Sequence, residues 1–383
     1  MILCSKLTRV WYAGEMHRGA LSTFLTTAIV AATSAAGQSY VTFGTNRATA
    51  SPAYGLSDDG GTAVGWSASG NFNEPGYMWT EATGRVDFTG VNDDNSRAYG
   101  ISGDGQWAVG VGYRRAQRFN EAFRYRPGTN EFQFLGRVSG WGNSTSLDAS
   151  FDGSVVVGWS HENTQTFGRA FRWTEAGGMQ GLTLPDGSLY FSSKANAVSA
   201  DGSIIVGEAT DGEYADALVW SADGRATVLQ RLGDPTLTTV SAAYGVSANG
   251  RYIVGYSARA IQMTIWEDGV PTGLGLYEGR NTRAYAVSND GKVVVGEASG
   301  FQAIIWTEAR GLESLSAYLE YHGINLPLGF ELFRASGVSA DGQSILVLAA
   351  TPWGTTEGML FTIPAPAALP IFGVLYFTSR RRR

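Results

Sequence analysis

The sequence predicts an all-β protein: a seven-bladed β-propeller of four-stranded blades, closed by an N-terminal strand in the last blade. Three observations support this fold: a strand-and-turn pattern that occurs seven times, an aromatic-ended strand after each copy, and a lone strand ahead of the first copy. Glycine accounts for 51 of 383 residues, and only 16% of residues are charged. This composition suits many short, half-buried strands joined by turns.

The repeated turn has the form Ser-x-Asp-Gly or Ser-x-Asn-Gly and lies between two apolar runs. Its glycines are spaced 45, 48, 49, 48, 41 and 51 residues apart. An Asp-Gly or Asn-Gly pair predicts a tight hairpin, because both residues tolerate the positive φ that such a turn needs, and the serine can hydrogen-bond into it. Since a catalytic site needs only one set of residues, seven copies indicate structural turns. The pairs are Asp59 and Gly60, Asp104 and Gly105, Asp152 and Gly153, Asp201 and Gly202, Asn249 and Gly250, Asp290 and Gly291, and Asp341 and Gly342.

The strands of one repeat can be followed in the third copy. The run Val155-Val156-Val157 before Gly158 predicts a strand that is covered on both faces, and Ala170-Phe171-Arg172-Trp173 predicts the next one. A short outer strand and the strand before the turn bring the total to four, as in a propeller blade. We expect Gly158 to allow a close backbone approach. The recurrent aromatics are expected to fill the core between blades rather than to bind sugars: Trp79, Trp173, Trp220, Trp266 and Trp306.

The ends of the repeat region predict ring closure. The seventh copy stops after Phe361 without a last strand, and Tyr40-Val41-Thr42-Phe43-Gly44 has the character of the missing one. Pairing the two would remove an open sheet edge. The alternative, a β-solenoid, would need shorter and more uniform repeats. A binding site is expected in the irregular loops, such as 114–119 and a short helix within 315–323, or at the channel mouth.

The two termini read as targeting segments. We interpret residues 1–15 as a mis-assigned start and residues 16–37 as a signal peptide, because Met16-His17-Arg18 precedes a short apolar run and small residues. Residues 38–362 are the repeat body and residues 363–383 a sorting or anchor segment. The arginines at its end would stay on the cytoplasmic side of a membrane. The alternatives are a buried first helix and a frayed C-terminal tail.

Both the tail and the repeat resemble known bacterial families. An apolar stretch between two prolines and four arginines resembles the PEP-CTERM sorting signal, with Ala365 in place of its usual Glu; these residues are Pro364, Pro366, Arg380, Arg381, Arg382 and Arg383. The repeat resembles the HAF repeats of extracellular proteins, and the seventh copy departs from the pattern, with Val347 where the others have Gly. These resemblances imply an exported protein at the cell surface or in the extracellular matrix. They also imply exosortase-type sorting machinery as a partner and a transient or permanent membrane attachment through the C-terminal segment.

Composition narrows the chemistry of the body. Residues 38–379 contain 21 basic and 33 acidic residues, a net charge of −12, and their basic residues are scattered, so we expect no nucleic-acid partner. The single cysteine, Cys4, lies outside the body, which therefore has no disulfide framework. His161 and His322 stand alone, so neither a zinc site nor a catalytic triad is predicted. We expect no cofactor, with a calcium-stabilised scaffold as the alternative.

These expectations favour a binding or structural module over an enzyme. Its ligand would be a surface polysaccharide or a protein. The alternative is a propeller-type carbohydrate-active enzyme, either a glycoside hydrolase or a polysaccharide lyase. Carboxylates about 5 to 10 Å apart on one channel face would favour hydrolysis, whereas a channel lined only by small and apolar residues would favour binding.

Overall fold

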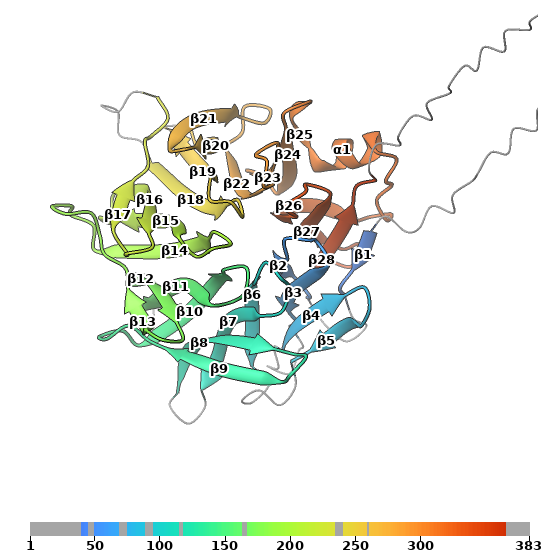
Figure 1. Cartoon of the computed structure of the whole chain (residues 1–383). Helices are drawn as coiled ribbons and strands as arrows, with labels where there is room; N and C mark the ends of the chain where they lie inside the picture. Colours follow the sequence, from blue (N-terminus) through green and yellow to red (C-terminus); the bar gives the residue numbers. More distant parts are fainter. Residues whose placement is uncertain are drawn as a thin grey trace, which may run out of the picture. The chain divides into compact units, whose positions relative to one another are not determined.

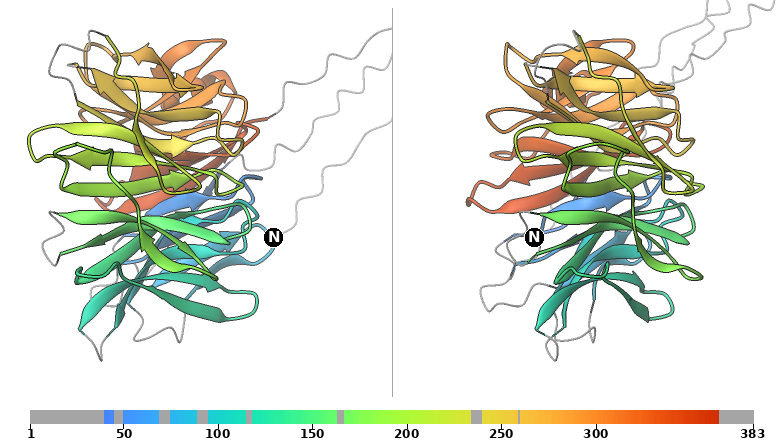
Figure 2. Two further views of the ribbon diagram at one scale, coloured as in Figure 1. Left: turned by 60° about the vertical axis from the view of Figure 1, so that its left-hand side comes forward. Right: turned by 90° about the vertical axis from the view of Figure 1, so that its left-hand side faces the viewer.

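The computed structural model describes residues 40–44, 50–68, 75–88, 95–114, 118–162, 167–233, 240–258 and 260–364. They form seven four-stranded antiparallel sheets, which stand as blades around a central channel (Figure 1). This arrangement confirms the predicted seven-bladed β-propeller. Seen from the side, the strands of every blade run across the thickness of the ring (Figure 2).

Each blade runs from an innermost to an outermost strand. The innermost strands are β2 (Ala53–Leu56), β6 (Ser96–Ile101), β10 (Asn143–Ala149), β14 (Ser192–Val198), β18 (Val240–Val246), β22 (Thr282–Val287) and β26 (Glu331–Val338). The second strands are β3 (Thr62–Trp66), β7 (Ala108–Arg114), β11 (Val155–His161), β15 (Ile204–Thr210), β19 (Tyr252–Ala258), β23 (Val293–Ala298) and β27 (Ser344–Ala350). The third strands are β4 (Gly76–Thr80), β8 (Phe119–Arg126), β12 (Gly168–Thr174), β16 (Ala215–Ser221), β20 (Gln262–Glu267), β24 (Gln302–Thr307) and β28 (Thr356–Thr362). The outermost strands of blades 1 to 6 are β5 (Gly84–Asp87), β9 (Glu131–Gly136), β13 (Gly178–Gly181), β17 (Ala226–Val228), β21 (Val270–Gly275) and β25 (Gly311–Ser314).

The seventh blade takes its outermost strand from the N-terminal side of the chain. The short strand β1 (Tyr40–Thr42) pairs antiparallel with β28, with Tyr40 opposite Phe361 and Thr42 opposite Met359. Phe43, which is 1% exposed, then packs against the rings of Tyr77 and Trp79 in blade 1. The predicted closure is therefore present, and it ties blade 7 to blade 1.

The continuous apolar runs are explained by packing between blades. In β11 of blade 3, Val156 belongs to a buried cluster with residues of blade 2, whereas Val155 and Val157 belong to a cluster with residues of blade 4. Each second strand is thus covered on both faces by its neighbours, so it has no polar side to alternate with. Trp173 and Trp220 are 3% and 0% exposed and fill these clusters, as expected of core aromatics.

The glycine after each apolar run lies where two strands of one blade approach closely. A Cβ added to Gly158 would overlap the carbonyl oxygen of Thr145 on β10 and lie 2.9 Å from Ser146 Cα. Blade 7 has Val347 at this place and accommodates it with an irregularity that the other blades lack. There β26 carries a second register shift, between Leu332 and Arg334, which alters the path of the backbone beside Val347.

The seven repeated turns join the first and second strands and share one hydrogen-bond pattern. In blade 4, Ser199 Oγ donates to Asp201 Oδ1 at 2.7 Å and accepts from the Ile204 N–H at 3.0 Å. The Asp201 carboxylate also accepts from the Ser203 N–H at 2.9 Å. In every turn only the glycine has a positive φ, between +70° and +76°. The turn differs in this respect from the predicted hairpin, because Asp or Asn caps amide groups with its side chain instead of adopting a positive φ.

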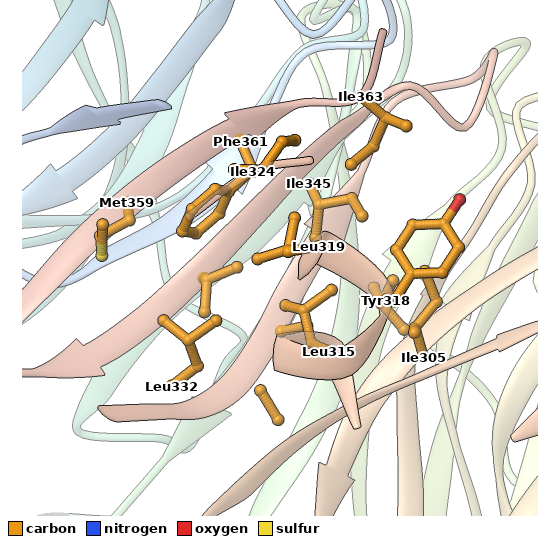
Figure 3. Close-up of a cluster of buried hydrophobic side chains, with 14 of the residues drawn as sticks. Ile305, Leu315, Tyr318, Leu319, Ile324, Leu332, Ile345, Met359, Phe361 and Ile363 are labelled. Atoms are coloured by element: carbon orange, nitrogen blue, oxygen red, sulfur yellow. The ribbon is translucent and has the colours of Figure 1, made fainter. Parts of the chain in front are cut away.

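A short helix lies between blades 6 and 7, within the predicted segment 315–323. Helix α1 (Leu315–Tyr321) begins after Ser314, whose hydroxyl accepts from the Ala317 N–H at 3.2 Å. Its buried residues, Leu315, Tyr318 and Leu319, recur at helical spacing and face one apolar cluster. Figure 3 shows this cluster, in which the helix packs against β24 and the strands of blade 7.

Candidate functional site

The central channel is the candidate site. It encloses a cavity of about 400 Å³, lined by the seven innermost strands and by the turns that follow them. All seven innermost strands have a β-bulge at the same position of the repeat. The residue that follows the bulge pairs with the second strand and is Gly, Ala or Asp. A bulge re-aims the extra side chain, and here every bulged residue lines the cavity. These residues, which we call the bulge ring, are Tyr54, Tyr99, Leu147, Asn196, Tyr244, Tyr285 and Ser336.

A second level of the channel carries positive charge. Two residues before the bulge, four blades have a cation: Arg97, Lys194, Arg283 and Arg334. Each cation contacts a residue of the preceding blade. In all four cases that residue directly follows the repeated glycine of the second strand. Arg97 lies 4.5 Å from the Trp66 ring, Lys194 5.5 Å from Trp159, and Arg283 5.5 Å from Tyr256. Cation–aromatic contact is therefore a recurring feature of the blade junctions at this level.

At the junction of blades 6 and 7 the aromatic is replaced by Glu297. Its carboxylate accepts from Arg334 Nε at 2.7 Å and from Tyr285 Oη at 2.7 Å, and Arg283 Nη1 lies 3.8 Å away. Arg334 also lies 4.8 Å from the Tyr285 ring. These contacts hold Tyr285 and Arg334 against the Glu297 carboxylate, and the two arginines leave the cluster with a net charge of +1.

At the junction of blades 3 and 4 the charges are less well paired. Lys194 and Glu208 are cross-strand neighbours on β14 and β15. Burial lowers the pKa of Lys194 and raises the pKa of Glu208, and each charge only partly offsets the burial of the other. Within the described part of the chain, the Lys194 ammonium has no ion pair within 4.0 Å and no hydrogen bond; it lies 5.5 Å from the Trp159 ring.

Asp148 is an unusual residue in the channel wall. The other blades have Gly or Ala at its position, where the innermost strands of neighbouring blades approach closely. Its carboxylate accepts from the Val198 N–H of blade 4 at 2.9 Å. Burial raises the pKa of Asp148 to about 7 despite this hydrogen bond.

The far end of the channel is narrowed by the turns. Backbone hydrogen bonds link neighbouring turns around the ring, for example from the Asp58 N–H to the Gly103 carbonyl at 3.0 Å and from the Ala340 N–H to the Asp58 carbonyl at 2.8 Å. At one junction the side chain of Asn289 takes over, accepting from the Asn249 N–H at 3.0 Å. We call this end the turn face and the opposite end the mouth.

The turn residues predicted from the sequence are all at the turn face. Asp59, Asp104, Asp152, Asp201, Asn249, Asp290 and Asp341 each accept from the serine of their own turn and from a backbone N–H two residues on. Among the described residues, no group of three His, Cys, Asp or Glu side chains is placed to hold a metal ion. Of the predicted sorting residues, Pro364 is the last described one; Pro366 and Arg380 to Arg383 lie outside the described residues.

The two histidines lie apart from each other. His161 is 1% exposed, its Nε2 lies 3.3 Å from Thr145 Oγ1, and burial lowers its pKa. His322 follows α1 and contacts the rings of Tyr318 and Tyr321. No helix within the described ranges is long and apolar enough to span a membrane.

The channel residues were not predicted from the sequence, although a signal for them exists. The bulge ring lies three residues before the serine of each turn, and the cations lie five residues before it. When the seven copies are aligned on the serine, the residues at these two positions vary in chemical type. The residues at the positions beside them are mostly small.

Comparison with known proteins leaves the functional inference to the channel residues themselves. No protein-family model matches the sequence, and no curated protein matches it.

Proposed function

We propose that this chain is an exported cell-surface or extracellular-matrix repeat protein that acts as a binding module, and that its ligand enters the channel from the mouth. On this proposal it is a HAF-repeat protein with a signal peptide at 16–37 and a PEP-CTERM-like segment at 363–383. Its partners are the export and exosortase-type sorting machinery and a surface polysaccharide or protein.

The observation that carries the proposal is the contrast between framework and channel. The three side-chain hydrogen bonds of the turn are the same in all seven blades. The bulge ring, by contrast, contains tyrosine, leucine, asparagine and serine. If the ring had only a structural role, there would be no reason for the side chains of the bulge ring to differ in polarity between blades. A ligand without sevenfold symmetry would require such differences.

The placement of the chain ends supports a surface role. Thr362 pairs with Ser344, the first residue after the last turn, and the Ile363 N–H donates to the Gln343 carbonyl of that turn at 2.7 Å. Tyr40 is paired with Phe361 beside it. Both described ends therefore leave from the turn face, so attachment through the C-terminal segment would leave the mouth accessible to a ligand.

The enzymatic alternative has one supporting observation. Glu208 faces the channel level of Lys194, and its raised pKa is a property of a general acid. The other channel glutamate, Glu297, belongs to a different blade and is held by Arg334 and Tyr285. Asp58 and Asp148 also line the cavity, burial raises the pKa of both, and the charge of Asp58 adds to the shift of Asp148, so the cavity is not lined only by small and apolar residues.

Two measurements test the proposal. The purified chain is screened on a glycan array and against surface proteins, together with Tyr244→Ala in the channel and Val270→Ala on an outer strand. Binding that Tyr244→Ala weakens and Val270→Ala retains, with both variants folded, supports a channel ligand. Absence of any bound ligand, or release of new reducing ends or unsaturated products from a bound polysaccharide, contradicts a non-enzymatic binding module. Cell fractionation tests export, and a chain found only in the cytoplasm would contradict it.

A further inference from the structure

The mouth half of the channel is a positive region within an acidic body. The body has a net charge of −12, yet Arg97, Lys194, Arg283 and Arg334 all stand at one level of the innermost strands. Of these cations, Lys194 and Arg334 line the cavity; the carboxylates at this level are Glu208 and Glu297, and Asp58 and Asp148 line the cavity nearer the turn face. Field lines from charges on the walls of a narrow channel are focused into it, so this level attracts an anion while the outer surface repels large polyanions.

Lys194 is the cation with the strongest need for a counter-ion. It lines the cavity, and burial lowers its pKa because its charge has lost part of its hydration. A buried charge is costly unless it is paired. Among the described residues its ammonium has neither an ion pair within 4.0 Å nor a hydrogen bond; the charge of Glu208 on the neighbouring strand offsets its burial only in part, and the Trp159 ring lies 5.5 Å away. An anionic group in the cavity would supply the missing partner.

The surroundings of Lys194 suit a sugar ring rather than a bare ion. Asn196, two residues along the same strand, lines the cavity, and its Nδ2 donates to the Ala243 carbonyl at 2.8 Å. Tyr244, the next residue after Ala243, lines the cavity with an aromatic side chain. At the edge of the same junction, Phe167 and Phe191 are 37% and 47% exposed and their rings lie 5.0 Å apart. Lys194 thus lies near polar groups that can bind hydroxyls and near aromatic side chains that suit the apolar side of a pyranose.

We propose that the channel binds an acidic saccharide, a sugar that carries a carboxylate, with the carboxylate on Lys194 and the sugar against Tyr244 and Asn196. This inference rests on the proposed function as a binding module and names its ligand class. A nucleic acid fits less well, because the acidic body would repel its phosphate backbone along the whole ring. A carboxylate on a single sugar unit reaches Lys194 without placing further charge against the outer surface.

The experiment uses the purified full chain and isothermal titration calorimetry. The probe is digalacturonate, the shortest oligogalacturonate, and the matched probe is the same disaccharide with its carboxylates methyl-esterified. Inorganic phosphate and a single-stranded oligonucleotide are tested as other anions. The variant is Lys194→Met, which removes the charge and keeps the length of the side chain. The control is Lys292→Met, which removes an exposed lysine paired with Glu308 at the turn face.

We expect the oligogalacturonate to bind, its esterified form to bind at least roughly tenfold more weakly, and Lys194→Met to lose affinity by a similar factor at unchanged melting temperature. Lys292→Met should bind like the wild type, and added salt should weaken binding. Equal binding of the esterified form, equal binding of phosphate or the oligonucleotide, or full affinity in folded Lys194→Met would overturn the proposal. A chain that binds neutral glycans on the array but no oligogalacturonate would refute the acidic ligand and leave the binding module in place, whereas a chain that binds nothing refutes both.

Discussion

Replacing Gly158 with valine tests the close approach of the first and second strands within a blade. The Cβ of the new residue would overlap the Thr145 carbonyl oxygen and lie 2.9 Å from Ser146 Cα and 3.0 Å from Phe171 Cζ. Two of these neighbours are backbone atoms of β10, which cannot rotate away as a flexible side chain could. The strand pairing itself must therefore shift, and Ser146 Oγ would be moved from its hydrogen bonds to the Gly110 and Phe123 carbonyls.

The expected cost follows from the kind of neighbour. Inserting atoms into a well-packed core typically destabilises a protein by about 1–3 kcal/mol. We place Gly158→Val at or above the upper limit, about 3 kcal/mol, because backbone has to move in addition to side chains. For a domain of this size, that corresponds to a fall in melting temperature of roughly 5 °C. Gly158→Ala should fall between the wild type and valine.

The assay is thermal unfolding followed by circular dichroism at one scan rate, with Gly128→Val as the matched control. Gly128 has no atom within 4 Å of an added Cβ and does not have a positive φ, so its substitution should change stability by less than about 0.5 kcal/mol. If Gly158→Val melts together with Gly128→Val, the close approach is not a packing constraint and this account of the repeated glycine is wrong.

Four further changes test other parts of the fold, each by thermal unfolding. Ser199→Ala should destabilise the fold by about 1–2 kcal/mol, because the buried Ile204 N–H loses its acceptor. Asp201→Asn should be nearly neutral, because blade 5 has asparagine at this position. Equal effects of the two substitutions would contradict the shared turn pattern. Phe43→Ala should cost about 3–5 kcal/mol by emptying the contact between blades 7 and 1, and a smaller loss than for an exposed phenylalanine would argue against closure by β1. Val347→Gly should destabilise the chain although it restores the pattern of the other six copies, because Val347 is 0% exposed and its removal leaves a cavity; a more stable variant would refute the role given to the extra bulge. Because the pKa of Asp148 is raised to about 7, the folded state binds this proton more tightly than the unfolded chain, so stability should fall as pH rises from about 4 to about 7; Asp148→Asn should flatten that slope, and an unchanged slope would show that Asp148 is not its source.

The blade framework was predictable because it is periodic and its signals are local. The turn glycines recur at nearly constant spacing, and apolar runs such as the one before Gly158 indicate strands covered on both faces. Ring closure was predictable because blade 7 lacked one strand and the chain carried a spare one at Tyr40. The details of the turn were not, because whether Asp59 adopts a positive φ or caps amides with its carboxylate depends on the serine geometry, which spacing does not reveal.

The side chains that line the channel were not predicted from the sequence, and one reason is the bulge. In a regular strand, side chains point alternately to opposite faces, so a sequence pattern can assign each residue to one of them. A bulge inserts one residue and breaks that alternation at the place where Tyr99 or Asn196 enters the channel. The pairing of cations with residues of the preceding blade is still less visible, because Arg97 and Trp66 are far apart in the sequence and meet only when the blades stand side by side.

The same bulge separates what the fold needs from what a ligand would need. Serine, Asp or Asn, and glycine of each turn make the hydrogen bonds that hold a hairpin, and the small residue after each bulge allows neighbouring innermost strands to approach. The bulged side chain itself contributes to none of these bonds and ends in the cavity, so it can differ between blades at little cost to the framework. Asp148 is different, because it places a carboxylate at a position where the other blades have Gly or Ala. Burial of this carboxylate disfavours its charged form and raises its pKa. The residues that differ between blades with little effect on stability are therefore those of the bulge ring, which face the cavity. The buried carboxylate of Asp148 lies at the junction of blades 3 and 4, where Lys194 also lies.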